Sequence, residues 1–260
     1  MDWKKESEMF DQAAEYYDAF RPSYPKEIVN KIINTTGVNS NSRLLEIGAA
    51  SGKATALFAP YNFDIHCIEP GANLVKNGSI KFSEYINIRF EIARFEELDL
   101  LENYYDLIFS AQSFHWIPQP IGYEKCAYTL KDNGYLALFW NMYITYDNVI
   151  DNELLEISHK HGGFADFLSE DGCEKRICTI AEGISNSGFF HTPLIHRVLW
   201  SKEYTADEYC GFVQTGNRFV QKTEEEKHKA YADIKGLADR HEGKINRPYL
   251  CVLYLAKKIE

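Results

Sequence analysis

The sequence has no long apolar run, no excess of basic charge and no paired cysteine motif, and each absence excludes a class of protein. No apolar run approaches the roughly 20 residues that cross a membrane. A formal net charge of −10 argues against broad binding of a nucleic-acid backbone, although it leaves room for a local basic patch. The first six residues are charged and lack the apolar core of a signal peptide. We therefore expect a cytoplasmic protein without membrane or nucleic-acid partners.

The six cysteines are scattered through the chain without a Cys-x-x-Cys pair. The spacing of Cys173 and Cys178 fits no common zinc module, so we expect reduced, mostly buried thiols and no metal. A hydrophobic content of 45% over 260 residues is enough for a full core, in one large domain or two small ones.

The most informative stretch runs from residue 43 to residue 58. Its apolar start predicts a buried strand, Gly48 and Gly52 predict a tight turn, and Ala54, Leu57 and Phe58 predict one face of a helix. A strand, a glycine turn and a helix N-terminus together are typical of a nucleotide site, because the turn lets a ligand approach the backbone.

Glu46 decides which nucleotide the turn would accept. It ends the predicted strand two residues before Gly48, so its carboxylate would repel a pyrophosphate at close range and attract a cationic group. The turn therefore indicates an adenosine cofactor that carries positive charge.

Residues 46–52, Glu-Ile-Gly-Ala-Ala-Ser-Gly, resemble motif I of the class I S-adenosylmethionine-dependent methyltransferases. That motif is an acidic residue followed by three alternating glycines, and Ala50 stands where the middle glycine is usual. The added methyl group should narrow the approach to the backbone slightly. The resemblance implies S-adenosyl-L-methionine as the cofactor and Glu46 as the residue that holds its cationic end, directly or through a neighbour.

Glu69 ends the second predicted strand, residues 63–70, about 20 residues after Gly48. An acid in this place can accept hydrogen bonds from both ribose hydroxyls, because a carboxylate has two acceptor oxygens. Glu69 could also cap the helix that begins after Pro70, and the two roles are compatible.

Further strands are predicted at residues 87–92, 105–110 and 135–141, with a helix at 120–130 and a turn at 131–134. The alternation of strand and helix predicts parallel strands with right-handed crossovers. Strands at 192–204 and 246–257, with a charged helix at 222–238, complete the chain. The resemblance implies that the last two strands pair antiparallel at one sheet edge.

The loop after the fourth strand resembles motif IV of the family through its Phe-His-Trp sequence, residues 114–116. His115 could be a general base or a polar contact, because its ordinary pKa lies near working pH. It could equally be a structural histidine hydrogen-bonded beside Trp116. The loop after the third strand touches the adenine in the family, usually with an acid where Arg94 stands, and Phe95 is a further expected neighbour.

Two segments are predicted to cover the site. Residues 1–25 combine a short helix with a polar-aromatic cluster, which suits a lid over the cofactor, although a helix that only packs on the domain has the same pattern. Residues 142–188 depart from the strand–helix alternation, which indicates a helical insertion that serves as a substrate cap. A carboxylate substrate bound by Arg21 or Arg218 is a hypothesis.

The sequence thus predicts an α/β protein with a Rossmann-like, doubly wound sheet of seven strands. The sheet is expected to be mostly parallel with an antiparallel edge strand and a helical cap, in a single class I methyltransferase domain over residues 1–260. His115 is the catalytic candidate. The expected cofactor-binding residues are Glu46, Gly48, Ala49, Ala50, Gly52, Glu69, Pro70, Arg94, Phe95, Ser110, Ala111 and Gln112. The expected substrate or lid residues are Tyr16, Tyr17, Arg21, Tyr24, Trp116, Asn141 and Arg218.

The predicted function is in-line methyl transfer from S-adenosylmethionine to a small molecule. One alternative is a module on the same fold that binds the cofactor or a partner without turnover. Another is a NAD-dependent oxidoreductase, which the glycine spacing and Glu46 disfavour. The sequence predicts neither the methyl acceptor nor the oligomeric state.

Overall fold

The computed structural model describes residues 11, 14–164 and 167–259. The chain divides into two compact units. Unit 1 consists of Met1–Pro22, Met142–Glu174 and Leu199–Leu250. Unit 2 consists of Ser23–Asn141, Lys175–Val198 and Cys251–Glu260. The single domain over residues 1–260 stays a prediction.

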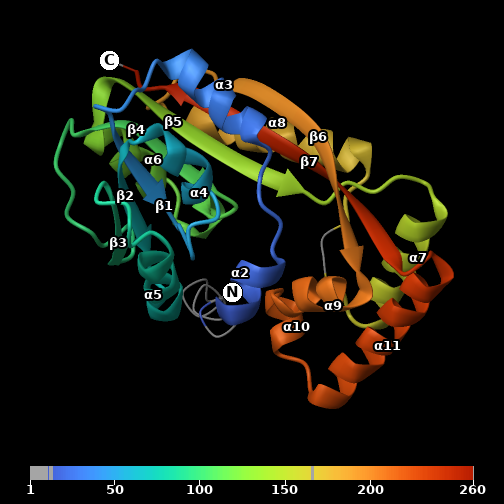
Figure 1. The fold of residues 1–260 in the computed structure, drawn as a ribbon. Coiled ribbons are helices and arrows are strands. Elements are labelled where there is room, and N and C mark those ends of the chain that lie inside the picture. Colours follow the sequence, from blue (N-terminus) through green and yellow to red (C-terminus); the bar gives the residue numbers. More distant parts are fainter. Residues whose placement is uncertain (1–10, 12–13, 165–166, 260) are drawn as a thin grey trace. The chain divides into compact units, whose positions relative to one another are not determined.

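The seven strands form one mixed sheet in the order β3-β2-β1-β4-β5-β7-β6 (Figure 1). The strands are β1 Arg43–Ile47, β2 Asp64–Glu69, β3 Ile88–Ile92, β4 Tyr105–Ala111, β5 Leu130–Met142, β6 Leu194–Thr205 and β7 Lys244–Lys257. The first five pair in parallel, and β7 is antiparallel and lies between β5 and β6. The predicted fold class is confirmed, with the antiparallel strand one place in from the edge.

Unit 2 is built on the apolar strands β1, β2 and β4. The helices that belong to it wholly or in part are α3 Lys26–Thr36, α4 Thr55–Phe58, α5 Ala72–Lys81, α6 Ile121–Thr129 and α8 Glu170–Asn186. Phe58 of α4 is fully buried and stacks on Phe109 of β4 with ring centroids 4.2 Å apart. Burying such a side chain stabilises the fold by roughly 2–3 kcal/mol. This contact holds the segment after the glycine turn against the sheet.

The helix after the glycine turn is shorter than predicted. It begins at Thr55 rather than directly after Gly52, and it gives way at Ala59 to a short 3₁₀ helix that contains Pro60. Proline has no backbone N–H and its ring clashes with the preceding turn of a helix, so α4 cannot continue. Before the helix, residues 51–54 form turns, and the first helical side chain is that of Thr55.

The predicted turn at residues 131–134 is wrong, because these residues lie within β5. The register explains why the sequence misleads. Leu130 pairs with Tyr105 and Tyr135 pairs with Leu107, so the residues between them form a bulge in β5 rather than an end to the strand.

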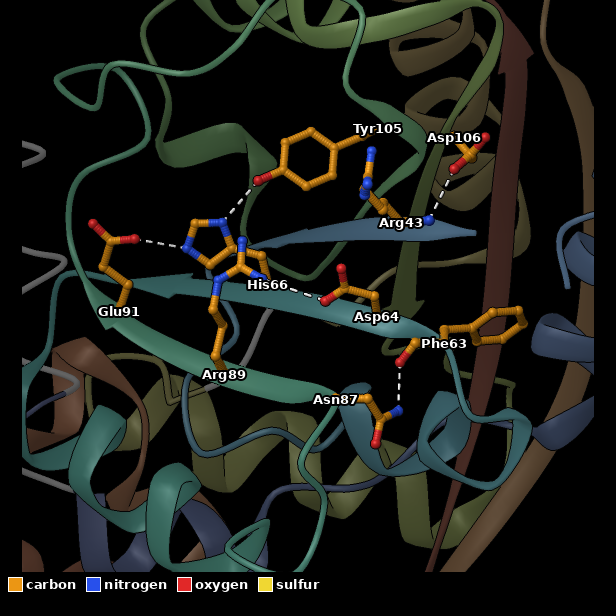
Figure 2. A network of polar contacts seen from close by, with 9 residues as sticks. All are labelled: Arg43, Phe63, Asp64, His66, Asn87, Arg89, Glu91, Tyr105 and Asp106. Atoms are coloured by element: carbon orange, nitrogen blue, oxygen red, sulfur yellow. Dashed lines mark hydrogen bonds and ion pairs between the residues drawn. The ribbon is translucent and has the colours of Figure 1, made fainter. Parts of the chain in front are cut away.

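A polar network joins β2, β3 and β4 in unit 2, and Figure 2 shows its side chains. The buried His66 has Nδ1 2.8 Å from the Tyr105 hydroxyl and Nε2 2.7 Å from the Glu91 carboxylate. A carboxylate only accepts, so Nε2 carries the hydrogen and the Tyr105 hydroxyl donates to Nδ1. Burial, and next the charge of Arg89, lowers the pKa of His66 and keeps it neutral. The network supports the sheet away from the strand end at Glu69.

Unit 1 is mainly helical. Its helices are α2 Ala14–Phe20, α7 Val149–Lys160, α9 Ala206–Gln214, α10 Asn217–Val220 and α11 Glu224–Arg240. Thr205 and Glu208 form a reciprocal capping box at α9, which the spacing of threonine and glutamate in residues 205–208 already indicates. Residue 211 is a glycine because the Phe20 ring of α2 lies against it, 2.4 Å from where a Cβ would stand. Over the described residues, no helix is long and apolar enough to cross a membrane.

Candidate functional site

The candidate site lies in unit 2, where the carboxyl ends of the parallel strands meet. β1 ends after Glu46, β2 ends at Glu69, and β4 ends with Ser110 and Ala111. Ligands of open parallel sheets bind at this edge, in the crevice outside the strand ends. The fold therefore brings together the predicted residues of motif I, Glu69 and the motif IV loop.

The turn after β1 takes a left-handed backbone three times. Gly48 has φ 67°, Ala50 has φ 48° and Gly52 has φ 82°. A residue with a Cβ is strained in this conformation by roughly 1 kcal/mol. Ala50 bears this strain at the position where the family has its middle glycine.

Glu69 holds the same turn from β2. Its Oε2 accepts a hydrogen bond of 3.0 Å from the backbone N–H of Ala50, and its Oε1 accepts one of 2.9 Å from the N–H of Gly71. These two hydrogen bonds use two of the roughly four lone pairs of the carboxylate. The side chain thus positions the turn and also supports the helix start after Pro70, which was the alternative role predicted for it.

Glu46 is buried beneath the turn with 1% of its surface exposed. Its Oε2 accepts from the Thr55 hydroxyl at 2.5 Å, and the Cys67 thiol lies 3.7 Å away. Burial raises the pKa of Glu46 from 4.5 to about 8, and the charge of Glu69 adds to the rise. At neutral pH the side chain is therefore mostly the neutral acid, and a nearby cation would favour its ionisation.

Two serines tie the loop after β4 to the end of β1. Ser110 Oγ lies 2.9 Å and Ser113 Oγ 2.7 Å from the carbonyl oxygen of Ile47, and the two hydroxyls are 2.6 Å apart. A Cβ on Gly48 would lie 2.4 Å from Ser113 Oγ, so the glycine also makes room for this contact. Sequence reasoning missed Ser113, and its only signal was its place next to Gln112.

The remaining predicted cofactor residues lie in this turn or at the ends of β2, β3 and β4. Ala49 and Ala111 are buried, and Gln112 has a left-handed backbone with φ 60°. Phe95 is 3% exposed and packs under the Lys125 ammonium, 5.6 Å from its ring centroid. Pro70 and Arg94 are half-buried. The adenine contacts predicted for Arg94 and Phe95 stay predictions.

His115 is exposed and stacks beside Trp116, with ring centroids 4.8 Å apart. The indole N–H of Trp140 points to His115 Nδ1 at 3.4 Å. With Nδ1 accepting, a neutral His115 carries its hydrogen on Nε2 and presents a donor there. The general-base role of His115 stays a prediction, and this arrangement favours a polar contact.

The predicted substrate and lid residues fall in both units. In unit 2, Asn141 donates a hydrogen bond of 2.9 Å to the Ser23 carbonyl, and Tyr24 packs edge-on to Phe139 at 5.0 Å. Tyr16, Tyr17, Arg21 and Arg218 belong to unit 1. Of the predicted lid, residues 1–10 and 12–13 lie outside the described part of the chain.

The cysteines take no part in this site except Cys67. Five of the six are buried, and Cys178 is exposed. Within the described ranges, no cluster of three histidine, cysteine or acidic side chains could hold a metal ion.

Comparison with known proteins finds similarity to methyltransferases. A family model described as a methyltransferase domain matches residues 45–138, which run from β1 into β5. The Saccharomyces cerevisiae protein named "Probable S-adenosylmethionine-dependent methyltransferase CRG1" is 29% identical over 159 residues, 60% of this chain and 54% of the relative. The "Uncharacterized methyltransferase Rv3342" of Mycobacterium tuberculosis is 23% identical over 95% of this chain and 92% of the relative.

A solved structure shows the same fold. The phosphoethanolamine N-methyltransferase 2 of Haemonchus contortus, in complex with phosphomonomethylethanolamine and S-adenosylhomocysteine, matches with a TM-score of 0.54. The match covers 96% of this chain and 58% of that chain at 12% identity, so it concerns the fold alone.

The sheet order and the glycine turn with its two strand-end acids define a class I methyltransferase fold. Residues 45–138 match the methyltransferase-domain family, and the chain is similar to a protein named as a probable S-adenosylmethionine-dependent methyltransferase. The chain spans about half the length of some of the curated relatives that it matches, 54% of the yeast protein and 49% of one from Schizosaccharomyces pombe.

Proposed function

We propose that the chain transfers a methyl group from S-adenosylmethionine to a small-molecule acceptor. The observation that carries this proposal is the pair of buried acids, Glu46 and Glu69, at the ends of two adjacent parallel strands beside the glycine turn. The Glu69 carboxylate disfavours a pyrophosphate and suits a ribose diol, and Glu46 can ionise beside the cationic end of a ligand.

The residues present fit the cofactor. Glu69 would accept from the ribose hydroxyls, and Gly48 and Gly52 leave the turn without side chains at two positions. The side-chain partners of Glu46 are a neutral hydroxyl and a neutral thiol. Neither carries a positive charge, so a cationic group of the ligand would add one.

S-Adenosylmethionine supplies a methyl group on a positively charged sulfur, and transfer breaks the sulfur–carbon bond as the acceptor's electron pair forms the new one. Such a displacement asks the protein for alignment and exclusion of water, and for a base only if the acceptor is protonated. Ser110 and Ser113 hold the loop that we expect beside the methyl group, and His115 would present an N–H there.

Two observations support a small-molecule acceptor. The net charge of −10 disfavours nucleic acid, and the Haemonchus relative was solved with a small acceptor. We also propose that residues 1–25 act as a lid, with Tyr17 and Arg21 as the first candidates for substrate contacts. Residues 142–188 would act as a substrate cap.

Calorimetry with S-adenosylhomocysteine and, separately, NADH tests the cofactor. We expect the first to bind and the second not to bind. Incubation with S-adenosylmethionine labelled in the methyl group, followed by mass spectrometry of a small-molecule panel, tests the transfer. Tight cofactor binding without any labelled product would favour a non-catalytic module, and binding of NADH instead would overturn the proposal.

A further inference from the structure

Unit 1 contains a cluster of buried and half-buried side chains that is rich in hydrogen-bond donors and poor in carboxylate acceptors. It is made of two arginines, an aspartate and four tyrosines: Arg21, Arg247, Asp151, Tyr143, Tyr204, Tyr209 and Tyr249. They come from distant parts of the sequence. None of the four tyrosines was singled out by sequence reasoning.

The aspartate of the donor cluster has little acceptor capacity to spare for the tyrosines, because three of its roughly four lone pairs are in use. Asp151 Oδ1 accepts from Arg247 Nη1 in a fully buried ion pair. Its Oδ2 accepts from the backbone N–H of Tyr146 at 2.9 Å and from the side-chain amide of Asn148 at 3.0 Å. The Arg247 guanidinium also lies over the Phe167 ring, 4.8 Å from its centroid.

Two buried donors of the cluster have no acceptor among the described residues. These are Arg247 Nη2 and the Tyr209 hydroxyl, on side chains that are 1% and 0% exposed. Native proteins satisfy nearly all buried polar atoms, so such a pair calls for an acceptor that the described residues do not supply. Tyr209 packs edge-on to Tyr204 with ring centroids 5.5 Å apart, and Tyr143 packs edge-on to Tyr249 at 5.5 Å. Arg247 lies two residues before Tyr249 on the same face of β7, so these side chains lie near one another.

More donors are left over nearby. The Tyr204 and Tyr249 oxygens are 2.7 Å apart, so one hydroxyl donates to the other and the second hydrogen must find another acceptor. The Tyr143 oxygen accepts from Arg21 Nη1 at 3.0 Å, which leaves its own hydrogen to donate. Burial raises the pKa of Tyr209 to about 12, so this hydroxyl remains a donor at working pH.

The chemistry of these donors separates two possible partners. A water molecule would accept from two of them but would bring two hydrogens of its own, for which the cluster offers mainly tyrosine oxygens. A carboxylate offers two oxygens with about four lone pairs and no hydrogen, and it pairs with guanidinium groups through charge-assisted hydrogen bonds. The surrounding rings, which include Trp200 stacked on Tyr249 at 4.9 Å, suit an apolar body behind that carboxylate.

We propose that the donor cluster binds a small-molecule carboxylate, with Arg247 Nη2 and the Tyr209 hydroxyl as its principal donors. The proposal keeps a carboxylate ligand, as was hypothesised for Arg21 or Arg218, but places its recognition on other residues of unit 1.

Thermal unfolding of the full chain with benzoate tests the proposal, with benzamide as the neutral control of the same shape. Benzoate should raise the unfolding temperature of the wild type, and benzamide should not. Tyr209→Phe should bind benzoate about tenfold more weakly. Equal protection by benzamide, equal benzoate affinity in Tyr209→Phe, or no protection by benzoate would each overturn the proposal.

A matched pair of variants tests the unpaired donor without any ligand. Tyr209→Phe removes a buried hydroxyl that has no partner, so its unfolding temperature should equal or exceed that of the wild type. Tyr249→Phe breaks the hydroxyl pair with Tyr204 and should unfold at a lower temperature. If Tyr209→Phe lost as much as Tyr249→Phe, the Tyr209 hydroxyl would have a partner and the proposal would be wrong.

The same samples separate this proposal from the proposed function. S-Adenosylhomocysteine should protect Tyr209→Phe as well as the wild type, because the cofactor residues belong to unit 2. A wild type that binds benzoate but not S-adenosylhomocysteine would remove the methyltransferase proposal and leave the carboxylate site. A wild type that binds only S-adenosylhomocysteine would do the reverse.

Discussion

Replacing Glu46 by glutamine should abolish the pH dependence of cofactor binding. The glutamine keeps the size of the side chain and can still accept from Thr55, but it cannot ionise. In the wild type, burial holds the pKa of Glu46 at about 8, so a cationic ligand that requires the carboxylate must first drive off a proton.

The size of the effect follows from this pKa. At pH 7 about one tenth of Glu46 is ionised, and ionising the rest costs about 1.4 kcal/mol. The affinity of the wild type should therefore rise roughly tenfold per pH unit below pH 8 and level off above it. In Glu46→Gln the affinity should stay at a low value throughout.

The stability of the ligand-free protein should change in the opposite direction. The folded state holds the Glu46 proton between pH 4.5 and about 8, whereas the unfolded chain has released it. The free energy of unfolding therefore falls by up to about 1.4 kcal/mol per pH unit as pH rises through this window. Glu46→Gln should lack this contribution and be more stable than the wild type at pH 8.5.

Calorimetry with S-adenosylhomocysteine from pH 6 to pH 8.5, and urea unfolding over the same range, measure both effects. A wild-type affinity that does not change with pH would refute the reasoning, as would a Glu46→Gln variant that keeps the slope. Either result would mean that Glu46 does not respond to the charge of the ligand.

Three further substitutions test other parts of the structure. Ala50→Gly should raise the free energy of unfolding by about 0.5 kcal/mol in urea titrations, because relief of a strain of about 1 kcal/mol outweighs the added freedom of the unfolded chain; a loss of stability would contradict the left-handed backbone. Ser113→Ala should weaken S-adenosylhomocysteine binding by up to about fivefold by calorimetry, since the contact with the Ile47 carbonyl is worth about 1 kcal/mol; unchanged affinity would refute the positioning role. Asp151→Asn should lower the free energy of unfolding by about 3–5 kcal/mol because Arg247 is left buried without its charge partner; a loss under 1 kcal/mol would contradict the buried pair.

The sheet could be predicted because each strand carries its own local signal. Apolar runs such as residues 105–110 and the capping residues at Thr205 are readable within a few positions, and the structure confirms them. The approach of Glu46 and Glu69 to one turn was also predictable, because parallel strands place their carboxyl ends at the same edge.

The sequence misled where tertiary pairing overrides a local signal. The Asp-Asn-Gly sequence at 132–134 is typical of a turn, yet the sheet absorbs it as a bulge. The burial of Glu46 under Thr55 and the contact of Ser113 with Ile47 depend on side chains packing across elements, which no local spacing encodes. The donor cluster of unit 1 joins residues more than 200 positions apart, and only the folded chain reveals it.

A crystal structure with S-adenosylhomocysteine tests the central claim most directly. We predict that its ribose hydroxyls lie within hydrogen-bond distance of Glu69 and that its homocysteine follows the turn between Gly48 and Gly52. Adenosine bound away from this turn, with no ribose hydroxyl on Glu69, would contradict the account.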